Sequence, residues 1–223
     1  HFFLDRGGKV YNRSAPVIKL RNASRDEDFF AVLGLLNSST VCFWLKQVSQ
    51  QKQMSGGESV RIESVSKVPY EFSSTQMQRI PVPARFGEST IRDRLIAAAK
   101  KLDELVRQQQ NLNPNSVIVD TLMNSTSIRE GWERHIEQRA KNRSMMIFLQ
   151  EELDFIVYVM FGLLPDSVLT DYDESASFSL EAGQRPFEIA CGSNPEGFST
   201  ATAPPPDWPE WLRMYWFSLT LSF

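Results

Sequence analysis

STIRDRLIAAAKKLDEL, residues 89–105, carries the clearest structural signal in the chain. Its apolar side chains recur at steps of four and three residues, namely Ile91, Leu95, Ala98, Leu102 and Leu105. This spacing places them in one narrow stripe along a helix, as in a helix that packs against a second helix. Three glutamines at 108–110 end the pattern. We therefore predict a helix over residues 89–110 with a buried stripe, followed by an Asn- and Ser-rich linker.

Downstream, the sequence predicts a second long helix over about residues 128–164. Its expected buried face consists of Trp132, Ile136, Met146, Leu149, Leu153, Ile156 and Met160. Gly162 and Pro165 are expected to end it, and His135 is expected to be solvated among charged neighbours. The apolar stretch 145–164 contains Gln150, Glu151, Glu152 and Asp154, which a bilayer core would penalise. We therefore expect no membrane partner.

Upstream, two short helices are predicted on either side of Asn37-Ser38-Ser39. Their side chains expected inside the protein are Phe29, Leu33, Leu36, Phe43 and Trp44. The segments 9–20 and 60–65 have the spacing of extended strands, and Phe187-Glu188-Ile189 resembles a further short strand. The pattern thus predicts short strands in addition to helices.

The formal net charge of −3 hides an uneven distribution along the chain. Residues 1–107 carry 17 Lys and Arg against 11 Asp and Glu, whereas residues 150–223 carry 2 against 12. A positive front half attracts polyanions such as DNA, although a solvated basic surface is an equally simple explanation. The acidic end is expected to avoid DNA.

Motifs that would indicate catalysis are absent from the sequence. We find no GxSxG, HExxH, GxxxxGK[ST] or GxGxxG pattern, so no catalytic, cofactor-binding or metal-ligating residues are predicted. Cys42 and Cys191 are far apart and belong to no CxxC pair. This usage is typical of proteins in a reducing compartment, and we expect a cytoplasmic location.

Several segments together resemble the C-terminal region of adenine-specific DNA methyltransferases from BREX phage-defence systems. They are Asn12–Leu20, Leu33–Thr40, Cys42–Gln47, Ile80–Pro83, Leu149–Asp154, Tyr158, Phe161–Leu163 and Arg185–Ile189. The Leu-Leu-Asn-Ser and Ile-Pro-x-Pro elements before the striped helix also resemble target-recognition domains of type I restriction specificity subunits. The resemblance covers most of the chain and weakens after residue 165.

This resemblance implies a modular enzyme in which an upstream domain binds S-adenosylmethionine and methylates adenine. Pro204-Pro205-Pro206-Asp207-Trp208 is a poor match to the Asn-Pro-Pro-aromatic loop of such enzymes. Because the chain also starts at His1 instead of Met, we expect a fragment without the catalytic domain, inactive alone and without cofactor. The implied partners are double-stranded DNA and the methyltransferase domain of the same polypeptide, and other phage-defence proteins are further candidates.

We accordingly predict an α+β fold: a mixed small-sheet recognition domain, then long helices and a loop-rich acidic tail. The expected divisions are a partial target-recognition domain at 1–88, a helical spacer or docking region at 89–164 and the tail at 165–223. The predicted DNA-binding residues are Lys46, Gln47, Gln51, Lys52, Gln53, Arg61 and Lys67.

Two alternatives stay open at this point. The Gln- and Lys-rich run before Gly56-Gly57 could equally be a frayed, solvated helix end. The chain could also be a stand-alone nucleic-acid-binding module, or a helical protein-interaction scaffold that dimerises through the striped helix.

Overall fold

The computed structural model describes residues 2–8, 17–21, 25–51, 70–113, 115–116, 118–119, 123, 127–169, 210 and 213. The main elements are α1 (Asp26–Asn37), α2 (Ser39–Val48), β1 (Gln50–Gln51), β2 (Tyr70–Glu71), α3 (Ser74–Met77), α4 (Ser89–Asn111) and α6 (Ile128–Met160). Two short 3-10 helices, η2 (Ala84–Gly87) and η3 (Asp166–Val168), flank α4 and α6.

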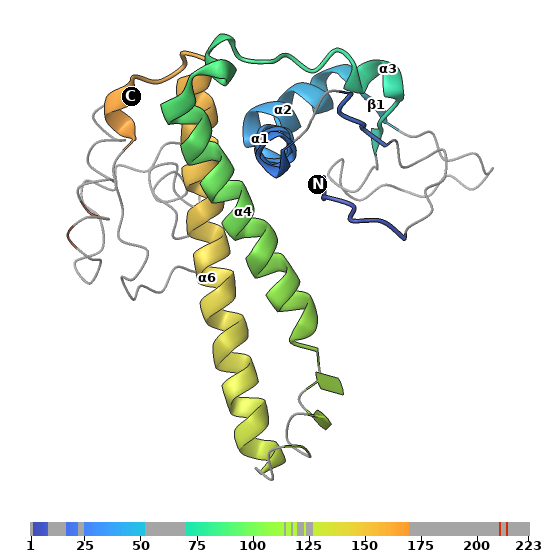
Figure 1. The fold of residues 1–223 in the computed structure, drawn as a ribbon, viewed down its shortest axis with the longest axis vertical. Coiled ribbons are helices and arrows are strands. Elements are labelled where there is room, and N and C mark those ends of the chain that lie inside the picture. The colour runs from blue at the N-terminus through green and yellow to red at the C-terminus, as the bar shows by residue number, and fades with distance from the viewer. Residues whose placement is uncertain are drawn as a thin grey trace, which may run out of the picture.

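Helices α4 and α6 form a long antiparallel hairpin, which spans most of the height of Figure 1. The predicted stripe of α4 faces the core: Ile91, Leu95, Ala98 and Leu105 are buried, and Leu102 packs against them from a half-buried position. The predicted helix over 89–110 is confirmed by the observed Ser89–Asn111. The stripe therefore serves packing within one chain.

Helices α1 and α2 pack against the end of the hairpin where α4 begins and α6 ends (Figure 1). Helix α1 lies close to α4 at Gly34, where an added Cβ would come within 2.8 Å of the Leu95 Cδ1 atom. Glycine is needed here because a larger side chain would overlap the neighbouring helix. Helix α2 contacts both α1 and α6, so α1, α2, α4 and α6 supply most of the described core, to which Val168 of η3 adds one more buried side chain.

Helix α6 differs in burial between its two halves. The core takes its α6 members from Met145 onward, where Leu149, Leu153 and Ile156 are each 1% exposed. The prediction that Trp132 and Ile136 are buried is wrong, because their side chains are 44% and 52% exposed. Apolar spacing marks a helix face, but α1 and α2 cover that face only near the C-terminal half.

His135 also departs from the sequence prediction. It is buried at 5% exposure, and its ring stacks on Trp132 with centroids 5.5 Å apart. The expectation of a solvated histidine is therefore wrong. The indole of Trp132, three residues earlier on the same helix, covers one face of the imidazole.

The predicted end of α6 is confirmed. The helix stops at Met160, and Gly162 adopts the left-handed backbone conformation with φ 70°. The amide of Leu163 donates to the carbonyl of Tyr158 at 2.9 Å, and that of Gly162 donates to Val159. These bonds satisfy the last helical carbonyls, as expected of a glycine after a helix.

The predicted α+β fold class is wrong for the residues that the structure describes. They are overwhelmingly helical, and their strand pairing consists of Gln50↔Glu71 and Gln51↔Tyr70 alone. Of the expected strands, residues 9–16, 60–65 and 187–189 lie outside the described residues.

Within the described residues, no single helix is both long and apolar enough to cross a membrane. Helices α1 and α2 meet the length and composition criteria only as a pair bent by 61°. Both contribute buried residues to the helical core.

Candidate functional site

The N-terminus of α2 is fixed by two side chains of different elements. Ser38 caps the helix by accepting a hydrogen bond from the Val41 amide at 3.3 Å. Asp154 of α6 accepts two more, from the amide and the hydroxyl of Ser39, both at 2.6 Å. A carboxylate at this position satisfies exposed N–H groups and complements the positive end of the helix dipole.

The turn between α1 and α2 is part of a wider hydrogen-bond network. The Asn37 side chain accepts from the Phe2 amide at 2.8 Å and donates to the Phe2 carbonyl at 2.9 Å. The Gln150 amide donates to the Asn37 carbonyl at 3.2 Å. Two segments of the family resemblance, 33–40 and 149–154, thus meet at one joint that orients α2.

The C-terminal end of α2 is held by α3. The side-chain amide of Gln76 donates to the backbone carbonyl of Val48 at 2.9 Å, which satisfies one of the last helical acceptors. Ser73 and Gln76 form a capping box that starts α3. The short β1–β2 pairing lies next to this contact in sequence. Helix α2 is therefore fixed at both ends.

The middle of α2 has one buried face and one exposed face. Val41 and Leu45 are 0% and 4% exposed and point into the core. Lys46 and Gln47 are exposed on the other side, and Lys46 forms no ion pair with a described residue. This exposed face carries the ammonium group of Lys46 and the side-chain amide of Gln47, and both are accessible to a partner.

The predicted DNA-binding residues are only partly described by the structure. Lys46 and Gln47 are neighbours in the last turns of α2. Gln51 lies in β1, three residues after the helix ends. Lys52, Gln53, Arg61 and Lys67 lie outside the described residues. The structure thus brings Lys46 and Gln47 together on α2, and all seven DNA-binding assignments stay predictions.

Many basic residues of the front half are engaged in contacts within the chain. Arg92 pairs with Asp28 at 2.6 Å, and Arg6 pairs with Asp103 at 2.6 Å. Lys100 donates to Glu27 at 2.9 Å, and this hydrogen bond lowers the pKa of the Glu27 carboxyl below 4.5. The positive excess is therefore used in part to join α1 and the N-terminal segment to α4.

Arg85 of η2 forms the most extensive of these contacts. It donates to Asp166 of η3 and to Glu88, and these bonds raise the pKa of its guanidinium. The same bond from Arg85 lowers the pKa of Asp166. The pair joins the start of α4 to the segment after α6, so it has a structural role.

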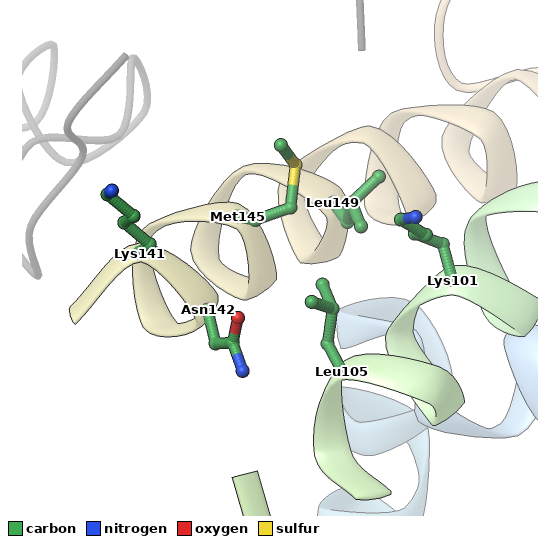
Figure 2. A pocket seen from close by; sticks show the side chains of 6 residues that line it. All are labelled: Lys101, Leu105, Lys141, Asn142, Met145 and Leu149. Carbon is green, nitrogen blue, oxygen red and sulfur yellow. The ribbon is translucent and has the colours of Figure 1, made fainter. Parts of the chain in front are cut away.

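A small pocket lies between the two arms of the hairpin. Figure 2 shows Lys101 and Leu105 of α4 across from Asn142, Met145 and Leu149 of α6. Its volume is about 220 Å³, below the range of roughly 300–1,000 Å³ typical of ligand sites. Lys141 at its edge pairs with Glu137 at 2.7 Å. This arrangement is a packing gap of the hairpin.

A larger cavity of about 580 Å³ lies between α1, α4, α6 and the N-terminal segment. Its lining is mainly apolar, with Leu33, Leu102 and Met146 among its members. Asp103 at this cavity already pairs with Arg6 and Arg107. Among the described residues, no group of three or more His, Cys, Asp or Glu could hold a metal ion.

The exposure of Phe43 on the surface of α2 was not predicted from the sequence. Phe43 was expected to pack inside the protein, but its side chain is 66% exposed, so that prediction is wrong. The buried face of α2 is set by Val41 and Leu45, four residues apart, and Phe43 lies between them in sequence. A helical wheel of residues 39–48 would have placed Phe43 beside Lys46 and Gln47.

Comparison with known proteins gives one informative match. The chain is 36% identical over 200 residues to "Adenine-specific methyltransferase PglX" of Streptomyces coelicolor. The match covers 85% of this chain, and the chain spans 15% of the length of that relative. No family model and no solved structure matches the chain. The resemblance to adenine-specific methyltransferases is thus confirmed, and the chain is related to a region of such a protein.

Proposed function

We propose that this chain is the DNA target-recognition region of an S-adenosylmethionine-dependent adenine methyltransferase that acts in phage defence of the BREX type. The similarity to PglX over 200 residues supports the link to methyl transfer. The proposal that this chain recognises DNA rests on the exposed face of α2. A helix fixed at both ends presents Lys46 and Gln47 in a defined direction.

The chemistry of these side chains suits duplex DNA. Lysine binds phosphates and guanine, and the glutamine amide can form paired hydrogen bonds with adenine in the major groove. Gln51, Lys52, Gln53, Arg61 and Lys67 extend the proposed surface along the following chain. S-adenosylmethionine and the methyl-transfer residues belong, in this proposal, to another domain of the same polypeptide.

In this proposal, three consecutive segments of the chain have different roles. Residues 1–88 select DNA, residues 89–164 hold the selecting part at a fixed distance from the methyl-transfer domain, and residues 165–223 face protein. The net acidic charge of the last part supports its separation from DNA, because like charges repel.

The scaffold alternative needs a surface other than the α4 stripe. Those residues are buried inside one chain and face α6. The exposed stripe Ile128, Trp132 and Ile136 on α6 is the surface that favours a protein partner. Under the proposed function this stripe faces the rest of the polypeptide.

Binding to duplex DNA at two salt concentrations tests the proposal. Fluorescence anisotropy of a labelled duplex should show binding that weakens steeply between roughly 50 and 200 mM salt. Lys46→Glu should weaken binding and lower the slope of log affinity against log salt by about 1, the effect of one phosphate contact.

Lys141→Glu is the matched control, since it makes the same change in net charge on α6. It should leave the affinity close to that of the unchanged protein. Equal loss in both variants would show that only net charge matters. Absence of salt-sensitive binding by the unchanged chain would contradict the proposal and favour a protein scaffold.

A further inference from the structure

One face of α6 continues from the larger cavity to the free end of the hairpin (Figure 1). Its residues follow each other at steps of four and three, so they lie on the same side of the helix. They are Ile128, Trp132, Ile136, Arg139, Arg143, Ile147 and Gln150. The first three are exposed apolar residues, and the last three line the cavity of about 580 Å³. The exposed stripe and the cavity are therefore parts of one surface, which we call the long face of α6.

The charges on this surface are mainly positive. Arg143 is exposed and forms no ion pair or hydrogen bond with a described residue. Arg139 donates to a backbone carbonyl at 3.3 Å, so that contact leaves its charge without a carboxylate. Asp103 is the one acidic residue that lines the cavity, and Arg6 and Arg107 already share it. A partner that carries carboxylates would complement this excess of cations.

Helix α1 shows how another helix docks on this hairpin. Its first turn is acidic: Asp28 pairs with Arg92 of α4 at 2.6 Å, and Glu27 accepts from Lys100 at 2.9 Å. Its buried apolar residues are Phe30, Ala31 and Leu35. An acidic amphipathic helix is thus the kind of element that the hairpin already binds within this chain.

Helix α1 covers only one end of this side of the hairpin. Leu33 and Asn37 of α1 line the cavity, whereas the stripe beyond the cavity is exposed. Phe2 and Phe3 line the same cavity, so polypeptide that precedes them in the proposed parent would enter beside the long face. The matched relative is much longer than this chain, which spans 15% of it. A tethered segment meets a neighbouring surface at a high effective concentration.

We propose that the long face of α6 binds an acidic amphipathic helix from the methyltransferase part of the same polypeptide. The apolar side chains of that helix pack on Trp132, Ile136 and the cavity wall, and its carboxylates pair with Arg139 and Arg143. The long face extends over about 33 Å at a rise of about 1.5 Å per residue, enough for a helix of roughly 20 residues. This inference rests on the proposed function and adds the position and chemistry of the contact to it.

Carbodiimide cross-linking of the intact parent polypeptide tests the inference, because this reagent joins a lysine to a carboxylate in direct contact. Arg143→Lys introduces a reactive amine on the long face and keeps the positive charge. The natural Lys141 is the matched internal control, since it lies on the opposite face and pairs with Glu137 at 2.7 Å. Mass spectrometry identifies the joined residues, and circular dichroism checks that each variant is folded.

Lys introduced by Arg143→Lys should cross-link to an Asp or Glu ahead of residue 1. That residue should lie in a segment whose apolar residues recur at steps of three and four. Lys141 should cross-link to Glu137 and not to that segment. Adding Ile136→Asp should lower the yield of the first cross-link at least about ten-fold, because it places a charge in the apolar contact. Leu163→Asp, at a position 62% exposed and outside the long face, should leave the yield unchanged.

Three results would overturn the inference while the proposed function stands. The first is a parent with a methyltransferase part to which Arg143→Lys forms no cross-link. The second is a cross-link between two copies of the chain, which would assign the long face to a second copy. The third is an equal yield with Ile136→Asp and Leu163→Asp. Binding of duplex DNA by the 223-residue chain is measured separately and does not depend on these results. If the parent contains no methyltransferase part, the inference and the proposed function are both wrong.

Discussion

The two halves of α6 differ in apolar content as well as in surroundings, because residues 128–144 contain few apolar side chains and residues 145–160 contain many. From Met145 to Met160 the helix supplies many of the buried core residues and packs against α2 and α4, whereas Ile128, Trp132 and Ile136 in the first half are exposed. Both halves belong to one uninterrupted helix, Ile128–Met160. An apolar stripe therefore identifies a surface that is suited to contact, and the neighbouring elements decide whether the contact lies within the chain.

The largest effect that this comparison predicts comes from truncating one leucine in the enclosed half. Leu149→Ala should lower the free energy of unfolding by about 2–5 kcal/mol, because it removes a buried side chain and leaves a cavity. Ile136→Ala should change it by less than about 0.5 kcal/mol, since that side chain is half exposed. Urea denaturation measures both, and equal losses would show that the exposed half is covered in solution.

The next largest loss of stability is expected when Asp154, which joins α6 to the N-terminus of α2, is replaced. Asp154→Ala removes the acceptor for both donors of Ser39, and loss of such a cap costs about 0.5–2 kcal/mol. The helical signal of α2 should weaken along with DNA binding, because Lys46 and Gln47 lose their fixed direction. Native-state hydrogen exchange of the amides in residues 39–48 measures this change. Unchanged exchange rates there would show that α2 does not depend on the joint.

A tight helix contact in the enclosed region should produce a smaller loss. Gly34→Ala places a Cβ within 2.8 Å of Leu95 Cδ1 and 3.3 Å of Ala99 Cβ. Overpacking of this kind costs roughly 1–3 kcal/mol, and the better helix propensity of alanine returns about 1 kcal/mol. We expect a net destabilisation of about 1 kcal/mol in thermal unfolding. A stabilised variant would show that α1 and α4 have room to separate.

The smallest effect is expected at the ion pair of the exposed half. The hydrogen bond from Lys141 lowers the pKa of Glu137 below 4.5. A carboxyl whose pKa is lowered on folding stabilises the protein above its unfolded pKa and loses that contribution as the pH falls through the folded value. Lys141→Gln should therefore slightly lower stability at neutral pH and make no difference at strongly acidic pH. A thermal unfolding series over pH, in which a difference persists in acid, would contradict this assignment.

Local spacing was sufficient to predict the helices that lie next to each other in sequence. The bounds of α4, its buried stripe and the end of α6 at Gly162 follow from side-chain periodicity and from the conformational freedom of glycine. The exposure of Lys46 and Gln47 follows equally well, because α2 has a regular pattern of apolar and polar residues.

Features that depend on distant residues could not be predicted in this way. The exposure of Trp132 and the absence of a larger sheet among the described residues are set by which elements pack together. The same holds for two basic residues of α4, which lie outside the candidate site. Arg92 and Lys100 appear available in the sequence, yet each pairs with an acidic residue of α1.

The long helix α6 sets a fixed distance between its exposed first half and the end that contacts α2. Ile136 and Asp154 are 18 positions apart on one continuous helix, so the rise of about 1.5 Å per residue separates them by roughly 27 Å. That distance corresponds to about eight base-pair steps of 3.4 Å. A protein bound to the exposed half of α6 would consequently stand clear of a double helix lying on α2, and both could be held at the same time.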